Sequence, residues 1–344
     1  MVDVTIRGAG IFGLSIAWAC LQRGAQVAII DPNGAGSGSS GGLVGALAPH
    51  TPDNWNEKKE FQFHSLVYAA EFWSKVDNAS GLSSGYTQTG RLQTIADDHA
   101  LALARERCLT SLKFWRGQAI WEVVDAKDQE PWAPKSETGL LIHDTLTARM
   151  HPQMACASLV KALRRSGVTV QSEGPDTGAV IWATGYQGLL ELTAQRGRLV
   201  GKGVKGQSAL LEFDARDKPQ LFADALHIVP HENGTVGIGS TTELEFDDPS
   251  STDDQLEDLL AKAILAFPVL NSAKVAGRWA GVRPRSKSRS PILGAHPYRQ
   301  GQFVANGGFK IGFGMAPRVA EVMADLVLAG EDNIPISFRP EACL

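Results

Sequence analysis

A glycine-rich turn between two apolar segments constrains this chain more than any other feature. Residues 2–6 alternate between apolar and polar side chains, which predicts a short strand, and residues 12–23 have the pattern of a helix that ends at Gly24. Residues 27–30 are a continuous apolar run, as expected of a strand buried in a parallel sheet. The chain therefore begins with a predicted β-α-β unit.

The turn of this unit reads Gly8-Ala9-Gly10-Ile11-Phe12-Gly13, a G-x-G-x-x-G pattern, and the second strand leads to Asp31. This context is typical of a dinucleotide-binding unit. Gly8 permits the tight turn, Gly10 lets the backbone approach a pyrophosphate, and Gly13 lets the helix pack on the strands. The helix N-terminus presents free N–H groups to the phosphates, and the Asp31 carboxylate accepts hydrogen bonds from ribose hydroxyls. The pattern alone does not separate NAD from FAD.

A glycine- and serine-rich segment, residues 34–42, follows Asp31 closely. Its composition suits either a flexible linker or a loop that cradles phosphates. A linker here would interrupt a domain that has only just begun, so we favour the phosphate-binding loop.

The rest of the chain alternates between helical and β-rich stretches. Helices are predicted at residues 55–76, 152–166, from 253 or 254 to 267, and 318–329, and strands at residues 168–170, 179–183 and in a hairpin around Asn233-Gly234. An α/β start, a β-rich middle and an α/β end predict one domain built from both ends of the chain, with a second domain inserted into it.

Composition limits the partners of the chain. A length of 344 residues favours two domains, or one with a large insertion, and a net charge of −4 argues against a nucleic-acid binder. The chain contains no apolar stretch of about 18 residues that could span a membrane. The four cysteines have no metal-ligand spacing and are expected to be free thiols, so we predict a cytoplasmic protein without a metal site.

Several further segments occur in an informative order. They are Ser39-Ser40-Gly41-Gly42-Leu43, Ala183-Thr184-Gly185, Gly281-Val282-Arg283-Pro284, Pro291-Ile292-Leu293-Gly294, Gly307-Gly308-Phe309-Lys310-Ile311-Gly312 and Ala316-Pro317. In this order they resemble the FAD-dependent D-amino acid oxidase superfamily, especially its glycine oxidase-like members. The resemblance spans nearly the whole chain, and the R-P…P-x-x-G…G-G-x-x-x-G…A-P series is its most specific part.

The resemblance implies an α/β fold, α+β overall. A Rossmann-like FAD-binding domain (residues 1–80, 138–205 and 275–344) would carry an inserted, mainly antiparallel substrate domain (residues 81–137 and 206–274). It also implies oxidation of the C–N bond of an amino acid or secondary amine, by hydride transfer to flavin N5. The cofactor-binding residues would be Gly8, Gly10, Ile11, Phe12, Gly13, Asp31, Ser39, Ser40, Gly41, Gly42, Leu43, Val170, Ala183, Thr184, Gly185, Arg283, Gly308, Phe309, Lys310, Ile311 and Gly312.

Three residues match positions at which the family contacts substrate. Arg283 falls where the family places an arginine for the substrate carboxylate, and a guanidinium suits this role because it forms two parallel hydrogen bonds. His227 replaces a tyrosine of glycine oxidase-like members, and Lys310 falls where some members place an arginine. Some relatives attach FAD through a histidine or cysteine, but residues 34–45 contain no His and residues 300–316 no Cys, so we expect non-covalent FAD.

Two differences from the family pattern leave more than one class of substrate possible. Ser288 replaces the usual aspartate, and its surroundings are basic, with Arg278, Arg283, Arg285, Lys287 and Arg289. This segment is either a solvated loop with one buried arginine or a site for an extended anionic substrate or an RNA phosphate. The alternative to a small-molecule amine oxidase is an enzyme resembling the FAD domain that removes a carboxymethyl group from a tRNA wobble uridine. The electron acceptor is oxygen or unknown, and a dehydrogenase that uses an acceptor other than oxygen is a further alternative.

Overall fold

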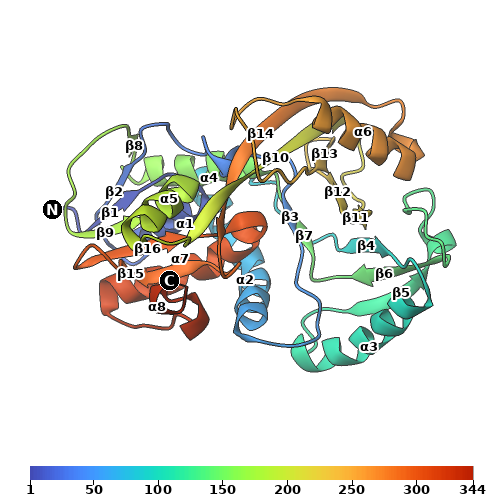
Figure 1. The fold of residues 1–344 in the computed structure, drawn as a ribbon, viewed down its shortest axis with the longest axis horizontal. Coiled ribbons are helices and arrows are strands. Elements are labelled where there is room, and N and C mark those ends of the chain that lie inside the picture. Colours follow the sequence, from blue (N-terminus) through green and yellow to red (C-terminus); the bar gives the residue numbers. More distant parts are fainter. Residues whose placement is uncertain (344) are drawn as a thin grey trace.

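A computed structural model describes residues 1–343, and its strands form two large sheets on opposite sides of the molecule (Figure 1). The first sheet has six strands in the order β15-β16-β9-β1-β2-β8. Their bounds are Ile292–Ala295, Gln302–Asn306, Ala179–Trp182, Val4–Arg7, Val27–Ile30 and Val170–Gln171. All neighbours pair in parallel except β15 and β16, which confirms the predicted Rossmann-like sheet.

The second sheet has eight strands in the order β14-β10-β13-β12-β11-β4-β6-β5. Their bounds are Lys274–Ser286, Gly201–Glu212, Thr235–Gly239, Leu226–Pro230, Gln220–Ala223, Arg91–Thr94, Leu140–Asp144 and Trp121–Asp125. Only β11 and β4 pair in parallel, so the sheet is mainly antiparallel, as predicted. The hairpin predicted around Asn233-Gly234 joins β12 and β13.

Helices pack on the parallel sheet and on one another. The helices are α1 (Ile11–Gln22), α2 (Glu57–Ser80), α3 (Asp98–Phe114), α4 (Pro152–Arg165), α5 (Gly185–Arg196), α6 (Asp254–Ala266), α7 (Gly312–Ala329) and the short α8 (Pro340–Cys343), and β3 (Ala46–Leu47) pairs with β7 (Ala148–Arg149). Helix α7 lies against α1 and α2, and α4 contacts both of these helices. No helix within residues 1–343 is both long and apolar enough to cross a membrane.

Several predicted boundaries are wrong for local reasons. Helix α7 begins at Gly312 instead of Arg318, and Pro317 lies inside it. Glycine at position 314 leaves room for Leu66 of α2, so this glycine permits close helix packing instead of a break. The predicted strand at residues 168–170 is β8, Val170–Gln171, and helices α3 and α5 are absent from the sequence-based prediction.

The sheets divide the chain slightly differently from the predicted domains, whose limits remain a proposal. Strand β6, Leu140–Asp144, falls in the range assigned to the FAD domain, yet it pairs with β4 and β5 of the eight-stranded sheet. The long strands β10 and β14 pair along their whole lengths, from Gly201 opposite Ser286 to Glu212 opposite Lys274.

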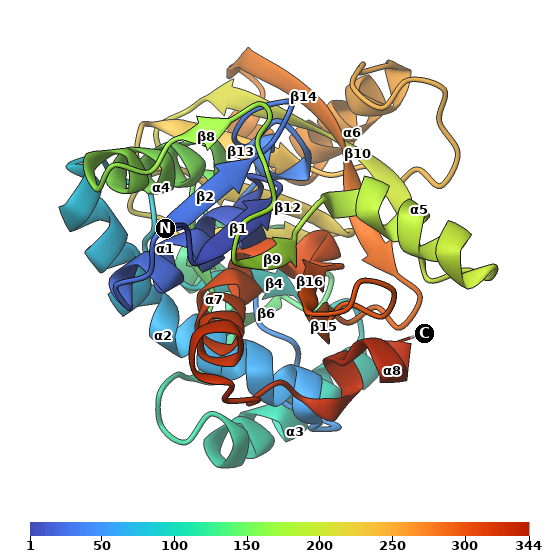
Figure 2. The same ribbon diagram turned by 90° about the vertical axis from the view of Figure 1, so that its left-hand side faces the viewer.

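Strand direction determines where the loops meet. Strands β1, β2, β9 and β16 are parallel neighbours, so they end at the same edge of the sheet (Figure 2). The glycine turn follows β1, Asp31 follows β2, the Ala183-Thr184-Gly185 segment follows β9, and the late glycine loop follows β16. Ligands of open α/β sheets bind at such an edge, so four separate sequence motifs converge on one place.

A buried ion pair holds the strands of the second sheet together. Arg91 of β4 donates from Nε to Asp144 Oδ2 of β6 over 2.9 Å, and the Asp144 side chain is fully buried. Asp144 also accepts a hydrogen bond from Thr147 N, over 2.9 Å. The carboxylate therefore fixes both a strand pair and the turn that follows β6.

We predict that Asp144→Asn lowers the free energy of unfolding by about 3–5 kcal/mol, because it leaves the Arg91 guanidinium buried without a counter-charge. Urea denaturation followed by circular dichroism measures the change. The control is Asp125→Asn on neighbouring β5, where the carboxylate is exposed and the change should stay within about 0.5 kcal/mol. Equal effects of the two substitutions would refute the structural role of Asp144.

Candidate active site

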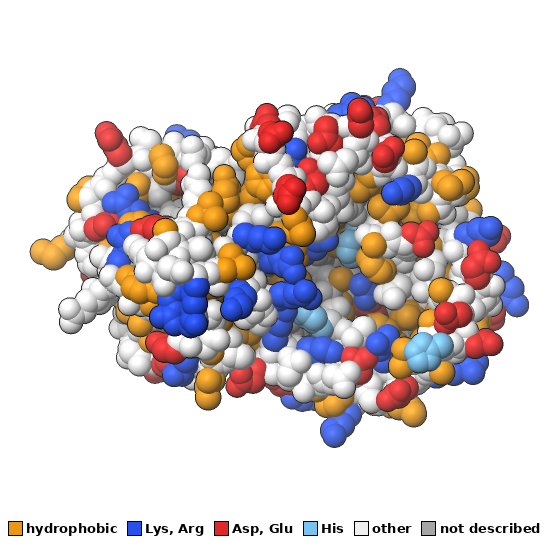
Figure 3. All heavy atoms as spheres, viewed as in Figure 1, with side chains coloured by type: hydrophobic (Ala, Val, Ile, Leu, Met, Phe, Trp, Pro, Cys, Tyr) orange, Lys and Arg blue, Asp and Glu red, His pale blue; other side chains and the backbone are white. Residues whose placement is uncertain are grey.

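A cavity of about 1010 Å³ lies where the strand ends of the first sheet face the second sheet. Its walls come from the glycine turn, the serine-rich loop, the Ala183-Thr184-Gly185 segment and the late glycine loop on one side, and from β11, β12 and β14 on the other. Figure 3, viewed from the same side as Figure 1, shows a hollow near the centre of the molecule with Lys and Arg side chains gathered beside it.

The glycine turn packs directly on the segment that follows β9. A Cβ atom at Gly8, where φ is +105°, would lie 2.3 Å from the carbonyl oxygen of Ala183, and one at Gly13 would lie 1.9 Å from the oxygen of Gly8. Both glycines are therefore required for the close approach of backbones. The first turn of α1 contains no acidic residue, which leaves its positive end available to an anion.

Asp31 is fixed beside this helix end by two backbone donors. Its Oδ2 accepts a hydrogen bond from Ala9 N over 2.8 Å, and its Oδ1 accepts one from Asn33 N over 2.9 Å. Asp31 lines the cavity, and a carboxylate oxygen has further lone pairs for a ribose hydroxyl.

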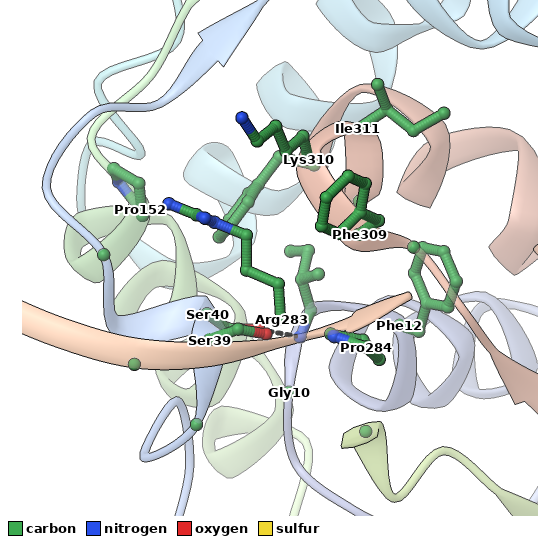
Figure 4. Close-up of a pocket in the computed structure, with 18 of the residues that line it drawn as sticks. Gly10, Phe12, Ser39, Ser40, Pro152, Arg283, Pro284, Phe309, Lys310 and Ile311 are labelled. Carbon is green, nitrogen blue, oxygen red and sulfur yellow. Dashed lines mark hydrogen bonds between the residues drawn. The ribbon is translucent and has the colours of Figure 1, made fainter. Parts of the chain in front are cut away.

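The serine-rich segment is a folded loop rather than a linker. Gly36 N donates to Ala9 O over 2.9 Å, and Ser40 Oγ accepts a hydrogen bond from Ile11 N over 2.9 Å (Figure 4). The Trp279 ring of β14 lies beside Gly41 and Gly42, where added Cβ atoms would be 3.5 and 3.6 Å from it. The loop is thus held against both the glycine turn and the second sheet.

The late glycine loop lies across the start of α1. A Cβ atom at Gly308 would be 3.0 Å from the Phe12 ring and 3.0 Å from the Gly312 Cα atom. Residues Phe309–Ile311 form a short 3₁₀ turn that leads directly into α7. The backbone of this loop therefore borders the cavity at close range.

Arg283 projects from β14 into the cavity with its charge unpaired. The residue is 8% exposed; Nη2 donates to Ser240 Oγ over 2.7 Å and Nη1 to Thr241 O over 3.2 Å. Both acceptors are neutral, and no carboxylate of residues 1–343 lies within ion-pair distance. Burial lowers the pKa of Arg283 to about 10, so the guanidinium stays charged at neutral pH.

A glycine on the neighbouring strand makes room for this guanidinium. A Cβ atom at Gly206 of β10 would lie 2.0 Å from Nη2 and 2.2 Å from Cζ of Arg283. Gly206 therefore determines where the guanidinium lies.

His227 and Lys310 face the same cavity from different elements. The His227 ring of β12 contacts Phe222, with ring centroids 4.7 Å apart, and burial together with the charges of Arg91 and Lys310 lowers its pKa to about 3. His227 is therefore neutral at physiological pH. Lys310 is more exposed, and its Nζ donates to Thr242 Oγ1 over 2.9 Å.

The structure brings most of the predicted site residues to the cavity wall, with three exceptions. Gly13 and Gly41 lie behind the wall and permit close packing, and Val170 lies in β8 at the edge of the sheet. The sequence did not point to several other residues at or beside the cavity: Trp279, Ser240, Phe222, His50 and Gly206. A glycine inside the long strand β10 was the one available signal for Gly206.

The sequence profile of a family described as FAD dependent oxidoreductase matches residues 3–326. The chain belongs to this family, the D-amino acid oxidase family. It is 27% identical to a glycine oxidase of Pseudomonas putida, with 99% of each chain covered, and 24% identical to a glycine oxidase of Bacillus subtilis, with 96% and 94% covered.

Solved structures of two oxidases superpose on this chain over nearly its whole length. A glycine oxidase from Bacillus cereus superposes with a TM-score of 0.82 at 20% identity, over 97% of this chain and 96% of the other. An iminodiacetate oxidase from Chelativorans sp. has a TM-score of 0.82 at 22% identity, with 97% of each chain covered. The chain is thus an FAD-dependent oxidoreductase of the glycine oxidase and amine oxidase type, and its fold is that of these enzymes.

The residues present fit FAD. The start of α1, whose first turn contains no acidic residue, and the backbone at Gly10 would hold the pyrophosphate, and Asp31 would hold the ribose. The late glycine loop, with Gly308 close to Phe12, would border the flavin. The wall offers neither a histidine in the serine-rich loop nor a cysteine in the late glycine loop for covalent attachment.

We predict that acid or heat denaturation releases all the flavin as free FAD, measured by fluorescence of the filtrate.

Asp31→Ala should weaken FAD binding about 10- to 100-fold, because it removes a charged hydrogen-bond acceptor. Glu173→Ala, an exposed carboxylate of the same sheet region, is the control and should retain FAD. Flavin that stays with the precipitated protein would contradict non-covalent binding.

Proposed function

We propose that this enzyme oxidises the C–N bond of a small amine that carries a carboxylate, such as glycine, a D-amino acid or an N-alkyl glycine. The observation that carries this proposal is Arg283, a buried guanidinium in the cavity wall that has only neutral hydrogen-bond partners. A buried cation without a counter-charge is costly, and a substrate carboxylate would supply that counter-charge. The names of the glycine oxidase relatives support the same substrate class.

The chain's own residues orient the substrate. The Arg283 guanidinium would hold the carboxylate in two parallel hydrogen bonds, and Gly206 and Ser240 fix the position of that guanidinium. Orientation of this kind supplies a large part of catalysis. Bound FAD would supply the two-electron oxidation by accepting a hydride at N5.

No residue of the wall is needed as a strong acid. His227 is neutral at physiological pH and carries an unpaired, buried Nδ1 atom, so its ring would contact the substrate without adding charge. An amine that arrives unprotonated avoids a further positive charge beside Arg283 and Lys310. We therefore assign His227 to substrate contact and Arg283 to binding and orientation.

The oxidase and dehydrogenase relatives suggest two different electron acceptors. Oxygen is the acceptor implied by the oxidase relatives, whereas an L-proline dehydrogenase from P.horikoshii shares the fold with a TM-score of 0.80. We therefore place oxygen first and a dehydrogenase with another acceptor second. We place a tRNA substrate behind small molecules, because the chain has a net charge of −4.

We predict that Arg283→Ala lowers kcat/KM by roughly 30-fold to several thousand-fold, since loss of one member of a desolvated charge pair costs about 2–5 kcal/mol. Arg283→Lys should recover only part of this loss, because an ammonium cannot form the planar two-point contact. Gly206→Ala should also lower kcat/KM, because its Cβ would displace the guanidinium.

The control is the corresponding amine without its carboxylate, which the native enzyme should oxidise poorly and the variant no worse. FAD content should stay near that of the native protein. Full activity of Arg283→Ala on the carboxylate substrate would overturn the assignment, and loss of FAD would make Arg283 a cofactor-binding residue.

A further inference from the structure

The charges of the cavity wall do not balance. Its Lys and Arg residues are Arg7, Arg91, Arg283 and Lys310, and Asp31 is its acidic residue. Arg7 pairs with Asp176 and Arg91 with Asp144, at 2.7 and 2.9 Å. Within residues 1–343, Arg283 and Lys310 have no carboxylate within 4.0 Å. Two cations are thus free, whereas a substrate with a single carboxylate would neutralise one.

Lys310, the second of these free cations, is held in place by a hydrogen bond. Lys310 Nζ donates one hydrogen bond to Thr242 Oγ1 over 2.9 Å, which leaves two N–H groups for a ligand. Burial and the positive charges of Arg283 and Arg285 lower the pKa of Lys310. In Figure 4, the side chains of Arg283 and Lys310 extend toward the same side of the cavity.

Arg285 adds a third cation behind Lys310. Residues 283 and 285 lie two apart on β14, so their side chains leave the same face of the sheet. The Arg285 guanidinium lies 5.6 Å from the centre of the Phe309 ring, beside which Lys310 also lies, with Nζ 5.9 Å from the centroid. Arg285 has no ion pair with any residue of the described chain.

The nearby glutamate does not cancel this charge. Glu243 opposes the lowering of the Arg283 pKa by burial, but it is itself buried with Lys205, whose Nζ is 3.5 Å from Glu243 Oε2. Glu243 Oε1 also accepts hydrogen bonds from Gln207 and Thr241. Glu243 is therefore neutralised within its own cluster, and the excess positive charge remains at Arg283, Lys310 and Arg285.

We infer that Lys310, with Arg285 behind it, forms a second anion subsite, so that the preferred substrates are dicarboxylate amines, with one carboxylate on Arg283 and the other on Lys310. The class includes N-carboxyalkyl glycines and amino acids with an acidic side chain. This inference rests on the proposed function for the position of the first carboxylate. A second carboxylate would neutralise the remaining free cation of the wall.

The test measures ligand binding to the FAD-loaded protein and needs no turnover. Oxydiacetate carries two carboxylates on an ether, and its monoamide carries one carboxylate in almost the same shape; neither has an amine to oxidise. Binding is followed by perturbation of the flavin absorption spectrum and by calorimetry. Oxydiacetate should bind about tenfold tighter or more, because only it pairs with the second cation. Added salt should reduce this preference.

Lys310→Gln and Arg285→Gln should each reduce the ratio of the two Kd values toward one. Lys274→Gln is the matched control, since Lys274 is an exposed cation at the far end of β14, and it should keep the native ratio. Equal affinities of the native protein for the two ligands would overturn the subsite, as would equal effects of all three substitutions. Salt-sensitive binding of total tRNA that is lost in Arg285→Gln would overturn it in favour of RNA.

The two proposals fail separately. If the native protein prefers oxydiacetate but no amine reduces its flavin, the subsite stands and the amine oxidation fails. If monocarboxylate amines reduce the flavin and the two ethers bind equally, the amine oxidation stands and the subsite fails.

Discussion

The site depends on one close contact between backbones, that of Gly8 with the carbonyl of Ala183. A Cβ atom at Gly8 would lie 2.3 Å from that oxygen, so a side chain would separate the ends of β1 and β9. These two strands pair in parallel, with Arg7 opposite Trp182, and the loops that follow them form one wall of the cavity. The same packing places Asp31 and the late glycine loop at this edge, because β2 and β16 flank the pair.

The second sheet contributes the side chains of Arg283, His227 and Phe222 to the cavity wall. Strands β10 and β14 pair over their whole lengths, and this register sets Gly206 against the Arg283 guanidinium. The buried carboxylate of Asp144 neutralises Arg91, one of the cations of the cavity wall. Arg283 and Lys310 have no such partner among the described residues, so these two cations favour an anionic substrate at their part of the cavity.

Features that depend on local sequence could be predicted, and features that depend on distant pairing could not. The glycine turn, Asp31 and the hairpin at Asn233-Gly234 are local patterns, and the structure contains each of them. The positions of Gly206 and Trp279 depend on the register between β10 and β14, which no local pattern encodes. The sequence places the start of α7 too late, because Gly312, Gly314 and Pro317 are of the types that usually end helices, yet all three lie inside α7. The family resemblance, rather than any periodicity, pointed to Arg283.

Anaerobic mixing of the purified holoprotein with a panel of amines tests the central claim most directly. The panel pairs each carboxylate amine with its decarboxylated counterpart, for example N-methylglycine with dimethylamine, and includes the matching hydroxy acids. Loss of the oxidised flavin absorption reports the reaction without reference to the electron acceptor. We expect the flavin to be reduced by at least one carboxylate amine, much more slowly by its decarboxylated counterpart, and by none of the hydroxy acids. Reduction by a hydroxy acid, with no reduction by any amine, would contradict the account.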